Sequence, residues 1–147
     1  MDYKDIVSEL APCGIDCSRC VFSAHGSIRK NAGELLESLS GFEKMAKFFA
    51  AENPALAGYD SFMAVLEFLR SGECQGCRTG AGCYDGCEAR NCAKTGKVDF
   101  CFECDSFPCD RNKFNPQLAE KWKTNNLAMK KSGVESFYTE QKKKPRY

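Results

Sequence analysis

Hydrophobic residues recur with a helical period in the first half of the chain, between two regions that are rich in cysteine. Ile28, Leu35, Leu36 and Leu39 share one helical face and predict a first helix from about residue 28. Two further helices are expected before Gly72. One opens with a capping-box pair, Ser40 and Glu43, and the other is capped by Asp60 or Ser61. We expect their large aliphatic and aromatic side chains to pack into a core rather than to line a ligand pocket.

Helical signals also occur at both ends of the chain. Residues 2–10 have apolar side chains at helical spacing and predict a short helix, which Pro12 ends. Asn115 followed by Pro116 predicts a helix start, and that helix should run to about Lys130 and end at Gly133. A last helix is expected over 134–141, followed by a frayed end, KKKPRY. The predicted fold class is mainly α, with helices around irregular cysteine-rich loops and little or no regular sheet.

Cysteine is concentrated in two stretches. The stretch 74–109 holds eight cysteines in 36 residues, and the segment CGIDCSRC spaces three more as C-x3-C-x2-C. Their Gly-rich and polar surroundings predict irregular turns that present sulfur atoms to a shared partner. The candidate ligands are all eleven cysteines: Cys13, Cys17, Cys20, Cys74, Cys77, Cys83, Cys87, Cys92, Cys101, Cys104 and Cys109.

The redox state expected for these thiols favours metal over disulfides. The first residues are acidic and basic rather than apolar, and no apolar run of signal-peptide or membrane length occurs. We therefore expect a cytoplasmic protein without a membrane segment, in which thiols stay reduced. The odd number of cysteines also speaks against a closed disulfide framework.

Zinc is the favoured metal, because C-x2-C pairs on turns present two thiolates to one ion. Three such pairs occur, and Cys74, Cys77, Cys101 and Cys104 are a candidate set for one ion. The only histidine, His25, is a weaker candidate. An iron–sulfur cluster is the alternative, although the C-x2-C-x2-C-x3-C-P run of bacterial ferredoxins is absent. The C-x3-C-x2-C spacing also resembles the cluster motif of radical S-adenosylmethionine enzymes, but the chain is too short for their part-barrel.

Catalytic signals are sparse, and the interpretation leans away from an enzyme. A reactive cysteine needs a lowered pKa and usually a base, for which only His25 is available. Acidic residues between the cysteines, such as Asp16 and Asp99, are expected to be solvated loop acids. Three arginines stand next to thiols and could offset the charge of a thiolate site: Arg19, Arg78 and Arg90.

Charge is distributed unevenly. Residues 1–110 carry 11 Lys and Arg against 17 Asp and Glu, whereas 111–147 carry 10 against 3. A solvated helix face is the favoured interpretation of this basic tail, and nucleic-acid binding is a disfavoured alternative. A protein partner is compatible with the sequence but is not identified by it.

The order of the cysteine motifs identifies a resemblance. CGIDCSRC, then CQGCR, then CEARNCAKTGKVDFCFECDSFPC and a basic helical tail resemble the bacterial and archaeal family known as domain of unknown function 3795. The family has no established activity, and the resemblance implies a metal-binding role. We therefore expect a single metal-organised domain over 1–147, in which cysteine loops 13–20 and 74–109 hold two or more metal ions. Residues 21–73 form a helical insertion in it, and 111–147 form the basic tail.

Overall fold

The chain divides into two units whose boundary falls at the edges of the cysteine stretches. The computed structural model describes residues 1–79, 82–84, 86–96 and 98–147. Unit 1 comprises Met1–Cys20 and Cys74–Tyr147, and unit 2 comprises Val21–Glu73. Over the described residues there are seven α-helices and no sheet, which confirms the mainly α fold class. Unit 2 has the same bounds as the predicted insertion, while the single metal-organised domain stays a prediction.

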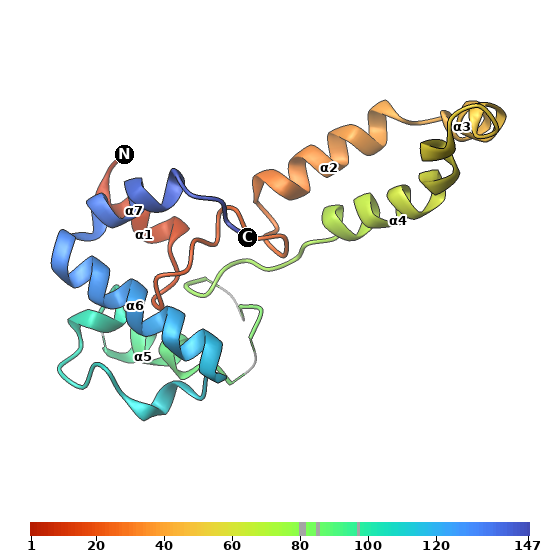
Figure 1. The fold of residues 1–147 in the computed structure, drawn as a ribbon. Helices are drawn as coiled ribbons and strands as arrows, with labels where there is room; N and C mark the ends of the chain where they lie inside the picture. The colour runs from red at the N-terminus through yellow and green to blue at the C-terminus, as the bar shows by residue number, and fades with distance from the viewer. Residues whose placement is uncertain (80–81, 85, 97) are drawn as a thin grey trace. The chain divides into compact units, whose positions relative to one another are not determined.

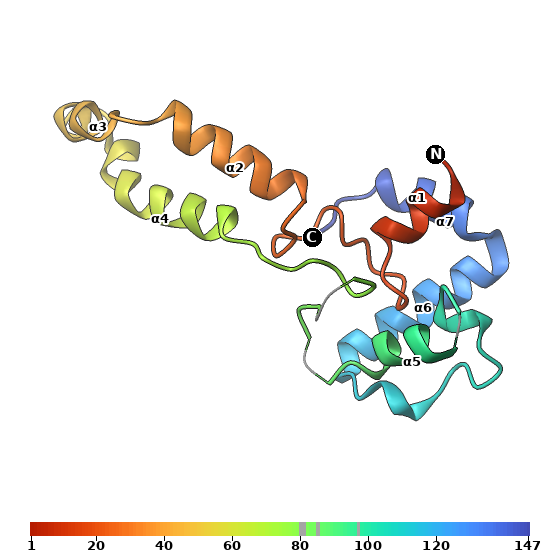
Figure 2. The same cartoon turned by 180° about the vertical axis from the view of Figure 1, so that it is seen from behind.

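Unit 2 is a helical hairpin closed by shorter elements (Figures 1 and 2). Its elements are α2 (Ser27–Ser38), α3 (Glu43–Phe49), the 3₁₀ turn η1 (Pro54–Gly58) and α4 (Tyr59–Arg70). Helices α2 and α4 run antiparallel, because each end of one helix contacts the opposite end of the other. Arg29 donates to the carbonyl of Arg70 (3.0 Å), and the Tyr59 hydroxyl donates to the carbonyl of Leu39 (3.5 Å).

Two sequence expectations for unit 2 are wrong. Ser40 does not cap a helix, since the N-cap of α3 is Phe42, and α4 begins at Tyr59, before Asp60 and Ser61. The apolar core of unit 2 is also smaller than we expected. Several large apolar side chains of this unit are at least 40% exposed, because a pair of helices can cover only one side of each: Phe22, Leu35, Met45, Phe48, Phe49, Phe62, Val65 and Phe68.

Unit 1 places the N-terminal and C-terminal helices together (Figure 1). Helix α1 (Tyr3–Glu9) packs on α7 (Val134–Lys142), and α7 packs on α6 (Pro116–Ser132). Asn115 caps α6 as predicted, with its side chain accepting from the amide of Leu118 (2.8 Å), and Gly133 ends it. These helices bury one apolar cluster: Ile6, Leu10, Phe100, Met129, Val134, Phe137 and Tyr138.

The cysteine-rich stretch contains more regular structure than we expected. Helix α5 (Glu88–Gly96) lies within it, followed by two 3₁₀ turns, η2 (Cys101–Glu103) and η3 (Asp110–Asn112). The composition of this stretch suggested only turns, yet the segment EARNCAKT is compatible with a helix because it contains neither glycine nor proline. Cys92 therefore lies on a helix, and Cys87 directly precedes it.

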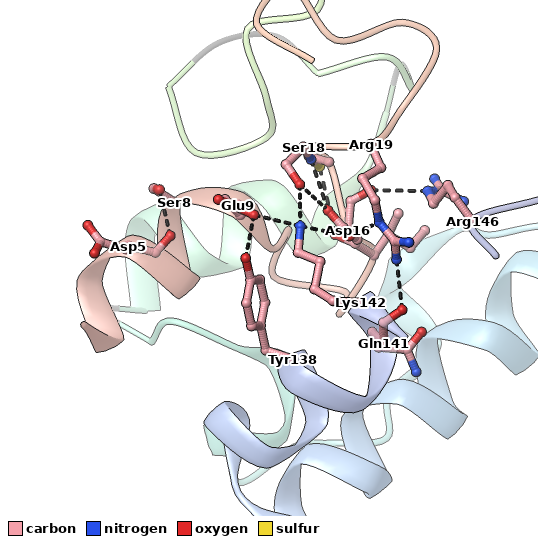
Figure 3. Close-up of polar contacts among 12 residues, drawn as sticks. Asp5, Ser8, Glu9, Asp16, Ser18, Arg19, Tyr138, Gln141, Lys142 and Arg146 are labelled. Atoms are coloured by element: carbon pink, nitrogen blue, oxygen red, sulfur yellow. Dashed lines mark hydrogen bonds and ion pairs between the residues drawn. The ribbon is translucent and has the colours of Figure 1, made fainter. Parts of the chain in front are cut away.

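The basic C-terminal run is anchored to the first cysteine loop rather than frayed (Figure 3). Lys142 forms ion pairs with Glu9 (2.7 Å) and Asp16 (3.2 Å). Arg146 donates to the backbone carbonyl of Asp16 (3.1 Å), and Arg19 donates to the carbonyl of Lys144 (2.8 Å). The expectation failed because composition shows which residues are charged, but not which buried acids they meet.

Asp16 is likewise not a solvated loop acid, since it is only 6% exposed. Burial is the largest influence on the pKa of this carboxyl and tends to raise it, while hydrogen bonds from Ser18 and Arg19 act in the opposite direction. The charge of Lys142 adds to them, so the pKa of Asp16 lies below its ordinary value. The folded state therefore contains a buried, fully paired carboxylate at the base of the first cysteine loop.

In the described parts of the chain, none of the helices combines the length and the apolar character that crossing a bilayer requires.

Replacing Lys142 should weaken unit 1 much more than replacing its neighbour. Lys142→Met leaves the Asp16 carboxylate with fewer partners, and we expect it to lower the free energy of unfolding by about 2 kcal/mol. Lys143 pairs with the exposed Glu140, so Lys143→Met should cost less than about 0.5 kcal/mol. Denaturant unfolding of both variants measures the difference. Equal losses would contradict the anchoring role of Lys142.

Candidate metal centre

All eleven cysteines lie in unit 1, although the whole of unit 2 separates the first three from the rest in the sequence. Each of them carries a free thiol. The fold therefore brings together the two cysteine stretches that the sequence keeps apart. His25, the weaker candidate, belongs to unit 2, and its role as a ligand stays untested.

One set of thiols gathers where the loop 13–20 meets the start of the second cysteine stretch. A hydrogen bond between the thiols of Cys17 and Cys77 raises the pKa of Cys17 and lowers that of Cys77 to about 6. Burial raises the pKa of the nearby Cys83 thiol, and neighbouring thiols raise it further. We call these residues the first thiol group: Cys17, Cys20, Cys74, Cys77 and Cys83.

Two arginines lie beside the first thiol group, and only one of them uses its side chain mainly to bond backbone carbonyls. Arg78 donates to the carbonyls of Val7 (2.6 Å) and Asp99 (2.7 Å), and its guanidinium lies 5.1 Å from the ring centre of Phe100. This residue ties the Cys74–Cys77 turn to α1, in addition to lowering the pKa of Cys77 by its charge.

Arg90 lies close to the Cys77 thiol. A Cβ built on Gly82 would lie 3.2 Å from both the Nη1 atom of Arg90 and the sulfur of Cys77. The charge of Arg90 helps to lower the pKa of Cys77. Its buried Nη1 has no hydrogen-bond partner in the described part of the chain. A buried N–H donor without an acceptor is costly, so negative charge on the neighbouring sulfur would be stabilised by this donor.

A second set of thiols surrounds a cavity of about 130 Å³ between α5, η2 and α6. Its walls are mostly apolar and include Ala89, Val98 and Trp122. Arg111 donates to the sulfur of Cys92 (3.7 Å). The four cysteines that line this cavity are the second thiol group: Cys92, Cys101, Cys104 and Cys109.

The second thiol group also has a buried N–H donor beside it. Trp122 is buried between Phe107 and Phe114, with ring centres 5.0 and 6.1 Å away. Its Nε1 lacks a hydrogen bond of ordinary geometry in the region that the structure describes. The indole N–H faces Cys101: burial raises the pKa of this thiol to about 11, and the indole acts in the opposite direction. Trp122 therefore offers a buried N–H donor to the second thiol group, as Arg90 does to the first.

Cys13 and Cys87 lie between the two groups, and both are buried. Burial, reinforced by the thiols of Cys77, Cys87 and Cys101, raises the pKa of Cys13 to about 12. Of the candidate set, Cys74 and Cys77 belong to the first thiol group and Cys101 and Cys104 to the second, and whether the four share an ion stays a prediction. As the side chains stand, no three Cys, His, Asp or Glu residues of the described ranges converge closely enough to enclose one ion.

Helix α6 fixes the positions of both cysteine loops through two adjacent buried asparagines. Asn125 donates to the carbonyl of Gly14 (2.9 Å), and the side-chain oxygen of Asn126 accepts from the amide of Phe102 (3.0 Å). Gly14 has a positive φ of 78°, and a Cβ at this position would lie 2.7 Å from the Cβ of Asn125. The loop 13–20 and the turn that carries Cys101 and Cys104 are thus held by neighbouring residues of one helix.

The sequence analysis missed these two asparagines. Asparagine disfavours helix interiors, so the pair Asn125-Asn126 in the middle of a long predicted helix was a usable signal of a structural role. Of the two N–H donors, Arg90 was indicated by its position near cysteines in the sequence, whereas Trp122 had no such signal, because its role depends on which thiol it lies beside.

Comparison with known proteins gives one match. The model of a family described as "Protein of unknown function (DUF3795)" matches residues 9–114, a range that contains every cysteine of the chain. No curated protein and no solved structure matches the chain significantly.

Removing the side chain of Asn126 should loosen one cysteine loop. Asn126→Ala leaves the Phe102 amide buried without its acceptor, and we expect a loss of about 1–3 kcal/mol in the free energy of unfolding. Alkylation mapped by mass spectrometry should then show faster modification of Cys101 and Cys104. Asn91→Ala, at an exposed position of α5, is the control. Unchanged alkylation in Asn126→Ala would show that the loop is held by other contacts.

Proposed function

The chain belongs to the DUF3795 family, and we propose that it is a metal-binding protein that holds two metal ions, with zinc as the first candidate, on cysteine thiolates. The observation that carries this proposal is the pair of buried N–H donors, Arg90 Nη1 and Trp122 Nε1, each facing one thiol group without a partner of its own. Metal-bound thiolates keep negative charge and accept such N–H groups, whereas neutral thiols are poor acceptors.

The first site would use two C-x2-C pairs, Cys17/Cys20 and Cys74/Cys77. Such pairs on turns suit zinc, which takes four ligands tetrahedrally with sulfur at about 2.3 Å. The hydrogen bond between Cys17 and Cys77 supports the idea that the two pairs face each other. Four thiolates around Zn²⁺ leave a net charge of −2, and Arg78, Arg90 and Lys94 are the cations near Cys77 that would offset it.

The second site would use the second thiol group. Here Arg111 and Trp122 supply the N–H donors, and the apolar cavity wall keeps water from competing. In both sites the sulfur atoms must move closer together on binding, because they do not enclose an ion as they stand. Metal binding would therefore also contribute folding energy to unit 1.

An iron–sulfur cluster at the second site is the second candidate, with a role in electron transfer or beside a redox enzyme. The cavity between the four thiols favours it, because a cubane cluster holds its cysteine sulfurs further apart than a single zinc ion does. For the zinc form we propose a binding or regulatory role, since the only histidine of the sequence, the usual general base beside a reactive thiol, belongs to unit 2 while all eleven cysteines belong to unit 1.

Elemental analysis of anaerobically purified protein tests both candidates. We expect two zinc ions per chain, and one in each of the double variants Cys17→Ser/Cys77→Ser and Cys101→Ser/Cys104→Ser. Cys83→Ser should keep two, because Cys83 lies beside the first site but outside its two C-x2-C pairs. A brown protein with iron and acid-labile sulfide would replace zinc by the second candidate. Less than one metal ion per chain after anaerobic reconstitution would refute metal binding itself.

Removing the metal should destabilise the protein. The ligands of the first site come from segments on both sides of unit 2, so a bound ion would hold these segments together. Chelation should therefore lower the free energy of unfolding by several kcal/mol, roughly 5. Thermal unfolding under reducing conditions, with and without a zinc chelator, measures this. The variant with both double substitutions is the control and should not respond to chelator. An identical melting temperature with and without chelator in the unsubstituted protein would mean that metal has no structural part.

A further inference from the structure

The turn between Cys17 and Cys20 is bonded to the end of α7 through both of its spacer residues (Figure 3). The hydroxyl of Ser18, the first spacer residue, donates to the Asp16 carboxylate (2.7 Å) and accepts from the Nζ atom of Lys142 (2.6 Å). The Ser18 amide donates to the same carboxylate (3.0 Å). Residues that are not cysteines therefore shape the turn that would present two sulfur atoms to a metal ion.

Arg19, the second spacer residue, uses all three nitrogens of its guanidinium in this contact. Nε donates to the Asp16 carboxylate (2.7 Å), Nη2 to the carbonyl of Gln141 (2.8 Å) and Nη1 to the carbonyl of Lys144 (2.8 Å). Both carbonyls lie near the C-terminus of α7, a place that favours a cation. The guanidinium next to Cys20 is thus bound to residues 141–146, which we call the C-terminal segment.

The other cysteine pair of the proposed first site is tied to the same two helices. Arg78, which directly follows Cys77, donates to the carbonyl of Val7 in α1 (2.6 Å), and α1 packs on α7. The amide of Cys17 donates to the carbonyl of Glu9, the last residue of α1 (2.8 Å). Contacts to α1 and α7 therefore orient both pairs of candidate ligands.

Lys142 balances the charge of the contact. Its Nζ atom lies 2.7 Å from the Glu9 carboxylate and 3.2 Å from the Asp16 carboxylate. Together with Arg19 it brings two cations to two carboxylates. Neutral thiols that bind Zn²⁺ release their protons, so the first site would become more negative when it is loaded. A neighbouring carboxylate that has lost its cation would oppose that change.

We propose that docking of the C-terminal segment onto the turn of Cys17 and Cys20 sets the metal affinity of the first site, with Arg19 and Lys142 as positioning residues. This proposal rests on the proposed first site. A turn that is already shaped loses less conformational freedom when the ion binds. Replacing residues that orient metal ligands typically costs about 10–100-fold in metal affinity. Because coupling between two binding equilibria is reciprocal, metal in the first site should also hold the C-terminal segment more firmly.

The zinc affinity of the first site alone tests the proposal, measured by competition with a chromophoric chelator under anaerobic reducing conditions. In the Cys101→Ser/Cys104→Ser background, Lys142→Met should lower this affinity by about 10–100-fold, and Lys142→Arg, which keeps the charge, should retain most of it. Lys143→Met breaks an exposed pair with Glu140 and is the matched control, with a change of less than about 2-fold.

Arg146→Gln is a milder second variant. It removes the hydrogen bond from Arg146 to the carbonyl of Asp16 (3.1 Å) and lies outside the helices, so the fold should be retained. We expect it to lower the zinc affinity of the first site by about 5-fold, the effect of one hydrogen bond.

The second site separates positioning from a general loss of stability. In the Cys17→Ser/Cys77→Ser background, which keeps the second site, Lys142→Met should change zinc affinity by less than about 2-fold, because Lys142 bonds to the first cysteine loop. Equal losses at both sites would overturn the proposal, since they would report general destabilisation.

Hydrogen exchange measures the reciprocal effect. Zinc added to the Cys101→Ser/Cys104→Ser variant should slow amide exchange in residues 141–147, and exchange that zinc leaves unchanged would overturn the coupling.

Failure of this proposal differs from failure of the metal site itself. Equal zinc affinities of Lys142→Met and Lys143→Met at the first site would overturn the coupling and leave the site standing. A Cys101→Ser/Cys104→Ser protein that binds no zinc would refute the first site, and this proposal with it.

Discussion

The buried carboxylate of Asp16 is the interaction on which unit 1 depends. A charge that is 6% exposed needs several partners to offset the loss of water. Asp16 obtains them from Ser18 and Arg19 in its own loop and from Lys142 at the end of α7 (Figure 3). The loop that carries Cys17 and Cys20 is thereby joined to the C-terminal helix, and the charge asymmetry of the sequence acquires a structural reason. The basic tail neutralises acids of the body to which it is attached.

Helix α6 plays the complementary part, since it connects the two thiol groups. Asn125 holds the loop 13–20, Asn126 holds the turn with Cys101, and Trp122 packs among thiols from both stretches. Cysteine side chains thus fill space in the second apolar cluster, in which aliphatic residues are few. Its buried members are Ala11, Cys13 and Trp122, and the partly buried residues packed against them are Ile15, Cys17, Cys77, Cys101, Phe107, Cys109 and Phe114. Metal-free thiols pack there as small apolar groups, so the same residues serve both the core and the proposed sites.

The sequence was sufficient to predict those elements that local chemistry determines. Asn115-Pro116 and Gly133 fixed the limits of α6, and the absence of cysteine marked the helical insertion. It was not sufficient for Asp16, the basic run or the grouping of thiols, because these depend on contacts between residues that are distant in the sequence, such as Arg146 with Asp16 and Asn125 with Gly14. Spacing suggested that Cys77 and Cys101 share an ion, which stays a prediction; in the fold both thiols act on Cys13, and each has a different N–H donor nearby.

Unit 2 shows the converse limitation of a periodic pattern. The period of α2 and α4 correctly predicts helices with an apolar stripe, but it does not state how many partners cover that stripe. Ala32, Tyr59 and Leu66 are buried by the other helix of the hairpin, whereas Leu35, Phe62 and Val65 stay at least 40% exposed. The two units thus leave different needs open. Unit 1 has thiols and N–H donors that would suit a charged ligand, whereas unit 2 has large apolar side chains that its own helices leave exposed and contains no cysteine.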